Sequence, residues 1–491
     1  MDSYDAIVYG NDLSTLIIST YIARRNKKVL YIDSKNRVGD YINLFHMRRF
    51  DIEDTLDTLV CDDSKLIDIF KLLGLNITFK TTNEVYHVIV NNKERNEILE
   101  YTLPKGIDNF INKVEEYVPN SSDSLKDFFD LALECKEAKN YLIRNQYNYK
   151  IVKEKYPNFV KVLGNTVSDV FDELDIPILA QEILNVCWTY FSSTETMTSF
   201  VDYAIFLYDF VEFNTQIPSI SYNRLCSLLL DEFLKYKGDY LNNAKIDKIL
   251  TVGKRVNGVS IDNKIYYNNK LITSINPDII YNDLIIKNEI PTNALKLNSK
   301  RRVDGNKFTI YIGLNRTVKQ LELNSYKYFL YKSLDSDVEY KNMSSINNTS
   351  SIVTIPSVIN KVSPEGTSVM IFNTIFFNES FSKYIDVNNY HSSVMEIANN
   401  IITNFENSTG KRIRDYIEEI KIFTPVDYEL KYNDSNYFGY ILNPLDDTVI
   451  RSVNINKESY IKGLYICGKY GVAGGISSNI IEHAVILGKN I

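Results

Sequence analysis

The first 33 residues alternate between strand-like and helix-like patterns, and this order constrains the fold more than any other feature of the chain. Residues 4–9 (YDAIVY) form a short apolar run that ends at Gly10, and residues 13–25 carry apolar side chains at helical spacing. A second apolar run, residues 29–32, ends at Asp33. Strand, glycine turn, helix and strand are the opening of a Rossmann unit, so the sequence predicts an α/β fold.

Two residues of this opening are candidates for binding a dinucleotide. Gly10 lies where the chain turns into the helix, and the free N–H groups of a helix N-terminus are a natural site for a diphosphate. Asp33 follows the second strand, where an acidic side chain can accept hydrogen bonds from a ribose. We therefore predict that Gly10 and Asp33 bind an adenine dinucleotide.

The C-terminal end repeats the pattern of strand, glycine loop and helix. The chain has 19 glycines in 491 residues, about 4% where about 7% is usual, yet four of them fall within residues 468–475. This cluster stands between an apolar run at 464–467 and a helical pattern at 477–487. So many glycines in a glycine-poor chain indicate backbone that approaches another group closely, although a tight loop that packs the last helix is an alternative.

The middle of the chain predicts a second domain. Residues 105–210 have mostly helical periodicity, residues 240–283 alternate like hairpin strands, and residues 308–314 and 368–377 are apolar strands. We predict a Rossmann-like domain with a second α+β domain that contains a mixed sheet and helices. The boundaries we expect are 1–80, 215–300 and 440–491 for the first domain and 81–214 and 301–439 for the second.

Charge and composition exclude several classes of protein. A net charge of −7 argues against nucleic acid as a partner, because such proteins need a basic face. The five cysteines are far apart and the four histidines are scattered, so neither a disulfide framework nor a metal site is expected. No apolar run approaches the 18 or so residues of a membrane span. A reducing, cytoplasmic location fits these features.

Two aromatic-rich segments are open to more than one interpretation. Residues 136–161 combine seven Lys/Arg with several aromatic side chains, which allows peripheral contact with an anionic membrane, but a solvated helix face is the more common explanation. Trp188, Tyr190 and the aromatic residues of 191–210 could line a hydrophobic tunnel, although at helical spacing they are more often core.

Nearly the whole chain resembles the flavin-containing family of phytoene desaturases, carotenoid isomerases and retinol saturases, which is related to amine oxidases and Rab GDP dissociation inhibitors. The resemblance rests on the order of several short segments. They are residues 4–39, Phe50-Asp51, YLNNAKIDKIL (240–250), ITSINPDIIYNDL (272–284), FTIYIGL (308–314), residues 356–372, Thr424-Pro425, Tyr437-Phe438-Gly439 and the closing GLYICGKYGVAGGISSNIIEHAVILGKNI.

This resemblance implies an FAD-dependent oxidoreductase that desaturates, saturates or isomerises a lipophilic small molecule such as a polyene or isoprenoid. The flavin itself would accept the hydride, so we assign no catalytic side chain. It implies that the backbone of Ile246 meets the adenine edge and that residues 468–476 meet the flavin and its ribityl chain. The residues expected to bind FAD are Gly10, Asp33, Gly39, Ile246, Gly468, Gly474, Gly475 and Ile476.

The sequence departs from the family where glycine should allow close approach to FAD. The G-x-G-x-x-G motif becomes GNDLST, with Asp12 and Thr15 in place of glycine, and the later glycine pair becomes Gly39-Asp40. A carboxylate 4 Å from a phosphate charge costs about 4 kcal/mol at an effective dielectric constant of 20. Two hypotheses follow: an oxidoreductase in which Asp12 and Asp40 weaken FAD binding, or a flavin-free protein that binds a protein partner or a lipidated protein.

Overall fold

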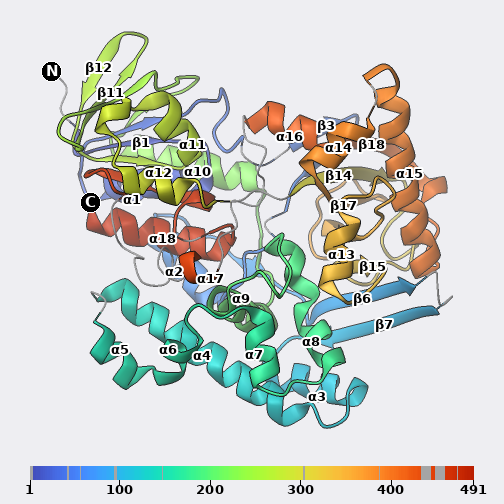
Figure 1. Ribbon diagram of the computed structural model, residues 1–491. Coiled ribbons are helices and arrows are strands. Elements are labelled where there is room, and N and C mark those ends of the chain that lie inside the picture. The colour runs from blue at the N-terminus through green and yellow to red at the C-terminus, as the bar shows by residue number, and fades with distance from the viewer. Residues whose placement is uncertain are drawn as a thin grey trace.

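Two sheets form the centres of two lobes in the computed structural model, and a layer of helices lies beneath them (Figure 1). The structure describes residues 4–40, 42, 44–55, 57–92, 97–145, 148–301, 305–385, 387–432, 444–447, 459–472 and 474–491. The N- and C-terminal segments lie together in the first lobe, in which segments far apart in the sequence join one sheet.

The sheet of the first lobe is parallel and has five strands. The sequence predicts its first two strands and its first helix correctly, with the helix α1 at Leu13–Arg24. The strand order is β19-β13-β1-β2-β9, with bounds β1 Ala6–Tyr9, β2 Val29–Ile32, β9 Asp239–Leu241, β13 Leu271–Thr273 and β19 Leu464–Ile466. Because β19 lies next to β13 and one strand from β1, the C-terminal glycine loop meets the first turn of the chain.

Both faces of this sheet are covered, which explains why its strands are continuous apolar runs. Val8 and Tyr31 point toward a helical layer, while Ile7 and Ile32 point toward a three-stranded antiparallel sheet. The helices are α1, α2 (Asp63–Leu72), α10 (Tyr222–Lys235) and α18 (Ser477–Asn490), and the covering strands are β10 (Lys248–Thr251), β11 (Val256–Ile261) and β12 (Lys264–Tyr267).

The second lobe contains a seven-stranded mixed sheet, as the sequence predicts for the second domain. All neighbouring strands are antiparallel except β15 and β6. The order is β18-β14-β17-β16-β15-β6-β7, with bounds β6 Glu84–Asn92, β7 Glu97–Pro104, β14 Gly305–Leu314, β15 Lys327–Tyr331, β16 Ser351–Thr354, β17 Ser368–Phe377 and β18 Ile417–Phe423. Helix α15 (Tyr390–Thr409) covers one face.

The other face packs on the helices predicted for residues 105–210. Most of the aromatic residues proposed for a tunnel are core in this layer: Phe206 and Phe210 stack with ring centroids 5.5 Å apart, and Phe200 is fully buried. The helices are α3 (Ile107–Tyr117), α4 (Ser122–Arg144), α5 (Tyr149–Lys155), α6 (Pro157–Val162), α7 (Val167–Glu173), α8 (Ile178–Leu184) and α9 (Phe200–Phe213), with a 3-10 turn η1 at Asn185–Tyr190.

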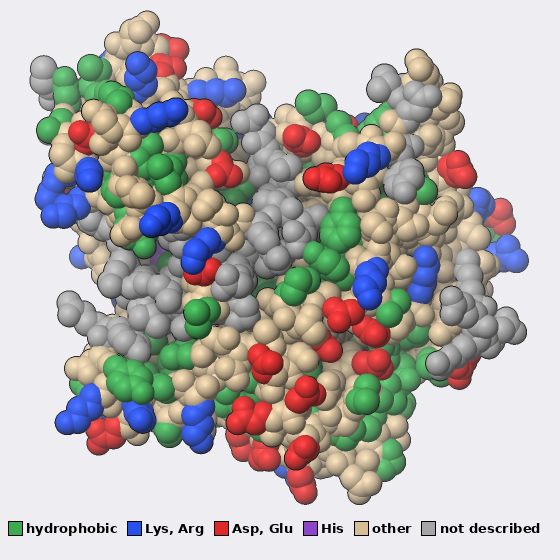
Figure 2. All heavy atoms as spheres, in the orientation of Figure 1, with side chains coloured by type: hydrophobic (Ala, Val, Ile, Leu, Met, Phe, Trp, Pro, Cys, Tyr) green, Lys and Arg blue, Asp and Glu red, His purple; other side chains and the backbone are tan. Residues whose placement is uncertain are grey.

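The basic segment 136–161 is divided among α4, α5 and α6 rather than forming one helix. Lys136 and Lys139 face inward and form ion pairs with Asp209 and Asp202 of α9. The remaining lysines lie at one edge of the molecule, where blue patches are visible over α5 and α6 (Figure 2). Membrane contact through this edge stays a prediction.

In the part of the chain that the structure describes, every helix is too short or too polar to span a bilayer. The strands of the parallel sheet all come from the three segments predicted for the first domain, although the expected domain boundaries themselves stay predictions.

Candidate functional site

The turn from β1 into α1 is the centre of the predicted dinucleotide site. The structure brings Gly10, Asp12 and Gly468 together here, because α1 begins beside the loop that follows β19. Gly10 is closely surrounded: a Cβ at this position would lie less than 3.0 Å from Ser274 Oγ and from Thr15 Cγ2. Ser274 follows β13 and was not predicted from the sequence, because only the parallel pairing of β1 and β13 places it at this turn.

Asp12 is the N-cap of α1, and its carboxylate points into the turn. Its Oδ1 accepts hydrogen bonds from the backbone N–H of Thr15 (3.0 Å), from Ser14 Oγ (2.9 Å) and from Thr15 Oγ1 (3.0 Å). Ser14 Oγ also lies 3.4 Å from Cys467 Sγ, across the turn. Burial raises the pKa of the Asp12 carboxyl, and these hydrogen bonds act in the opposite direction. Asp12 therefore fills the place next to the helix N-terminus.

Asp33 lies at the end of β2, as predicted, but it is 0% exposed. Its Oδ1 accepts the backbone N–H of Lys35 at 2.8 Å, and the hydroxyl of Tyr240 donates to Oδ2 at 3.5 Å. Burial raises the pKa of this carboxyl to about 7. A carboxyl group that is enclosed in this way is bonded to the protein rather than presented to a ribose.

The raised pKa of Asp33 predicts a pH dependence of stability. The folded state favours the protonated carboxyl, so the stabilisation is full below the unfolded pKa near 4 and is lost as pH rises to about 7. Asp33→Asn stays neutral and can still accept from Lys35. Relative to the variant, the wild type should lose about 2 kcal/mol between pH 5 and pH 8, measured by urea unfolding.

Asp62→Asn provides the control for this prediction. Asp62 caps α2 at the surface, and its hydrogen bonds with Ser64 lower its pKa, so it does not titrate in that range. An equal pH response in wild type, Asp33→Asn and Asp62→Asn would show that Asp33 does not titrate near neutrality.

The other residues predicted to lie near the adenosine part of FAD contact other residues of the protein. Ile246 is buried, and its backbone lies near the hydroxyl of Tyr9. Gly39 has φ +73°, and a Cβ there would lie less than 3.0 Å from Cys226 Sγ, so this glycine lets the loop pack on α10. Asp40 forms ion pairs with Arg37 (3.0 Å) and Lys431 (3.7 Å), which compensate its charge.

The C-terminal glycine loop leads into α18. Gly474 has φ +64°, Gly475 lines a cavity and Ile476 is the buried N-cap residue of α18. The backbone N–H of Ser477, the first residue of this helix, donates to Thr58 Oγ1 at 3.0 Å. The loop thus packs against both α1 and the segment around Thr58. The close approach predicted from the glycine cluster is here an approach to other parts of the same chain.

These contacts test whether the described residues fit FAD. The diphosphate position at α1 is taken by the Asp12 carboxylate, and the ribose acceptor Asp33 is enclosed. A diphosphate beside Asp12 would add like charge in a buried place at a cost of about 4 kcal/mol for each phosphate charge at 4 Å. The residues do not fit FAD in this arrangement.

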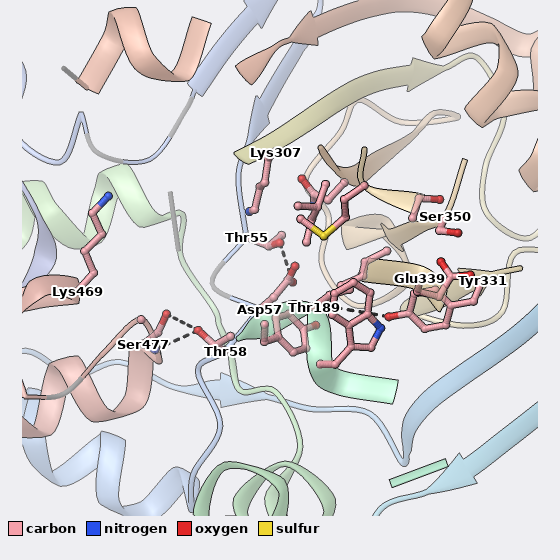
Figure 3. Close-up of a pocket in the computed structure, with 18 of the residues that line it drawn as sticks. Thr55, Asp57, Thr58, Thr189, Lys307, Tyr331, Glu339, Ser350, Lys469 and Ser477 are labelled. Atoms are coloured by element: carbon pink, nitrogen blue, oxygen red, sulfur yellow. Dashed lines mark hydrogen bonds between the residues drawn. The ribbon is translucent and has the colours of Figure 1, made fainter. Parts of the chain in front are cut away.

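A cavity of about 110 Å³ lies between the lobes beyond the glycine loop (Figure 3). This volume is below the usual range for ligand sites, which is about 300–1,000 Å³. One wall is apolar and includes Trp188, Tyr190 and Ile375, so two of the aromatic residues proposed for a tunnel do line a cavity. Polar groups also line it: Thr55, Asp57, Thr58, Thr189, Lys307, Glu339, Asn348, Ser350, Ser351, Asn373, Lys469 and Ser477.

Buried charges adjoin this cavity, and no sequence pattern indicates them. Lys327 Nζ lies 3.6 Å from Asp57 Oδ1 and donates to the hydroxyl of Tyr190 at 2.8 Å. Lys307, in β14, is buried near Asp54 and Asp57, and burial lowers the pKa of its ammonium group while these carboxylates raise it. The pairs join the loop after β4 (Phe50–Glu53) to the second sheet, which isolated sequence patterns do not reveal.

Comparison of folds identifies the class of structure. The chain aligns with a putrescine oxidase variant with a TM-score of 0.68 at 11% identity, over 99% of this chain and 98% of the other. It aligns with a Rab GDI from Plasmodium falciparum with a TM-score of 0.51 at 12% identity, over 100% and 98% of the two chains. The fold is therefore one that an oxidoreductase and a Rab GDI share.

A comparison of sequences adds one relative. The chain is 19% identical over 539 residues to an all-trans-retinol 13,14-reductase of Danio rerio, covering 100% of this chain and 87% of that protein. No protein-family model matches the chain. The expected α/β fold is confirmed, and the likeness to the retinol reductase and the shared folds support the family resemblance inferred from the sequence. The segment Tyr437-Phe438-Gly439 lies outside the described residues.

Proposed function

We propose that this chain binds a lipophilic molecule of the polyene or isoprenoid class in the cavity between its lobes. The observation that carries the proposal is the cavity itself, with an apolar wall formed by Trp188, Tyr190, Tyr331, Ile352 and Ile375. An apolar wall with a few placed polar groups is typical of sites for small organic ligands. The likeness to an all-trans-retinol 13,14-reductase also favours a lipophilic ligand.

The polar groups of the cavity would orient such a ligand. Glu339 and Ser350 lie at one end in Figure 3, while Lys469 and Ser477 lie at the other. Glu339 Oε1 accepts the backbone N–H groups of Lys332 and Ser333, both at 2.9 Å, so its carboxyl group is held in place. An elongated molecule would therefore meet polar groups at both ends and, between them, the apolar wall together with polar side chains such as Asp57 and Lys307.

FAD-dependent desaturation, saturation or isomerisation of the same molecule is a second candidate. The observation in its favour is that Gly475 and Lys469, from the glycine loop expected to meet a flavin, line the same cavity. When bound, FAD would supply hydride transfer. Since the residues at the first turn do not fit FAD, we derive no reaction step. A flavin-free protein that binds a lipidated protein partner would bind the lipid group in the same cavity. A protein partner and contact with a membrane are further proposals.

The single tryptophan of the chain allows a direct test of ligand binding. Trp188 lines the cavity, so a polyene bound there should accept energy from the excited indole. Titration with all-trans-retinol should quench the tryptophan fluorescence and saturate at one equivalent. Quenching that grows without saturation would show partition onto the surface and would contradict the proposal.

A variant that narrows the cavity should abolish saturable quenching. Ser350→Phe adds a ring at a buried lining position, whereas Ser344→Phe adds the same ring at an exposed position and serves as its control. Thermal unfolding establishes that both variants fold, and Ile480→Phe, on the side of α18, replaces Ser350→Phe if that variant does not. Unchanged binding in a folded, narrowed variant would place the ligand elsewhere.

A further inference from the structure

The backbone at Asp12 does not explain why a carboxylate replaces glycine here. Its φ of −99° and ψ of 174° are extended values that any residue adopts. Glycine at this point of the resembling motif therefore serves to leave space for a phosphate rather than to permit an unusual conformation. In this chain, a side chain occupies that space.

The carboxylate of Asp12 makes the contacts that an anion makes at a helix N-terminus. One oxygen accepts a backbone N–H and two hydroxyl groups, from Thr15 and Ser14. The other oxygen lies against Gly468, where a Cβ would come within 3.0 Å of it. An anion at this point also interacts favourably with the positive end of the helix dipole. The hydrogen bonds of Asp12 lie within the first turn of α1, and its other oxygen packs against the loop after β19.

The groups expected to bind the adenosine part of FAD also contact other residues of the chain. Asp33 is buried and bonded to Lys35 and Tyr240, and the Ile246 backbone lies near the Tyr9 hydroxyl. At the flavin end, Thr58 accepts the first N–H of α18. Asp33 and the first N–H of α18 thus have partners within the chain.

We infer that the Asp12 carboxylate is a built-in replacement for the diphosphate of FAD, so that the junction of α1 with the C-terminal loop is complete without a dinucleotide. The same fold elsewhere would need an external anion to bridge these two segments. Here the anion is the Asp12 carboxylate of the chain itself. The stability of the junction between α1 and the C-terminal loop therefore does not depend on a bound cofactor.

The first experiment examines the full chain as purified. It should show no visible flavin absorbance, and a saturating excess of FAD should leave the Tm unchanged. Release of FAD in a stoichiometric amount on denaturation, or a rise in Tm on addition of FAD, would overturn the inference. This readout does not depend on the lipophilic ligand, so it is separate from the test of the proposed function.

The second experiment removes the carboxylate and supplies an anion from solution. Asp12→Ala should lower the Tm by about 2–5 °C, because it removes an N-cap whose carboxylate also packs against the C-terminal loop. Inorganic pyrophosphate at millimolar concentration should restore most of this loss in Asp12→Ala and leave the wild type unchanged. Asp12→Asn, which keeps an acceptor oxygen but no charge, should show a smaller loss and weaker rescue.

Asp62→Ala is the matched control, because Asp62 is also an N-cap aspartate but lies at the surface. It should lose stability without rescue by pyrophosphate. Equal stabilisation of Asp12→Ala, Asp62→Ala and wild type would indicate a general salt effect and would contradict a specific anion position. An unchanged Tm in Asp12→Ala would likewise contradict the role of the carboxylate as a bridge.

Discussion

Replacement of Lys327 by methionine should lower the free energy of unfolding by about 3–5 kcal/mol, because the change leaves a buried carboxylate without its nearest cation. The Lys327 side chain is 4% exposed, and its Nζ lies 3.6 Å from Asp57 Oδ1. Its bond to the Tyr190 hydroxyl would also be lost. Urea denaturation of the two proteins at neutral pH measures the difference.

Lys411→Met is the control for this prediction. Lys411 pairs with Glu322, whose side chain is 75% exposed, and exposed pairs contribute about 0–1 kcal/mol. The double variant Lys327→Met/Asp57→Asn should recover part of the loss, because it removes both charges. If Lys327→Met were no more destabilising than Lys411→Met, the Asp57–Lys327 pair would not be a buried charge pair in solution.

Substitution of Gly468 by alanine should be the most disruptive change in the glycine loop. Gly468 has φ +66°, which alone costs an alanine about 1–2 kcal/mol. The new methyl group would also come within 3.0 Å of Asp12 Oδ2, and its next nearest neighbour would be Ser274 Cβ. We expect a total loss of about 3–4 kcal/mol, since overpacking adds about 1–3 kcal/mol. Chemical denaturation measures it.

Gly410→Ala separates the two contributions. Gly410 has nearly the same φ, +69°, but open space around its Cα, so it should lose only the conformational part. In an Asp12→Ala background, Gly468→Ala should cost less than in the wild type, because the carboxylate it meets is gone. Equal losses at Gly468 and Gly410 would show that the loop does not press against Asp12.

The proposed replacement of the diphosphate by Asp12 bears on where a ligand could lie in the cavity. Gly475 and Lys469 of the glycine loop line the cavity. A lipophilic molecule could then extend toward the glycine loop itself. Binding of retinol by a flavin-free preparation would support this arrangement, and it would also show that ligand binding and FAD chemistry are separable in this fold.

Local patterns in the sequence were sufficient to predict several elements of the fold. The apolar run 29–32 coincides with β2, and the helical pattern that begins at residue 13 coincides with α1. These elements depend on neighbouring residues: strands covered on both faces are continuously apolar, and helices have their own periodicity. The position of Gly10 at the first turn follows from the same local order.

The predicted site residues were brought together only in part. Gly10 and Gly468 meet at one turn, while Gly39 instead lets a loop pack on α10. The sequence showed that Asp12 replaces a glycine but left open whether its side chain turns away from the groove. Side-chain direction depends on Ser14 and Thr15 and on the loop across the turn, which are set by packing rather than by spacing.

The sequence by itself determined the alternation of strands and helices, the glycine cluster and the acidic replacements, because these are properties of residues close together along the chain. Only the tertiary structure placed Ser274 at the first turn, enclosed Asp33 and paired Lys327 with Asp57, which is 270 positions away. These contacts are formed when β13 pairs with β1, when β19 pairs with β13 and when the second sheet closes over the loop after β4. Hydrogen bonds and buried charges between distant segments depend on that assembly, and no local pattern encodes them.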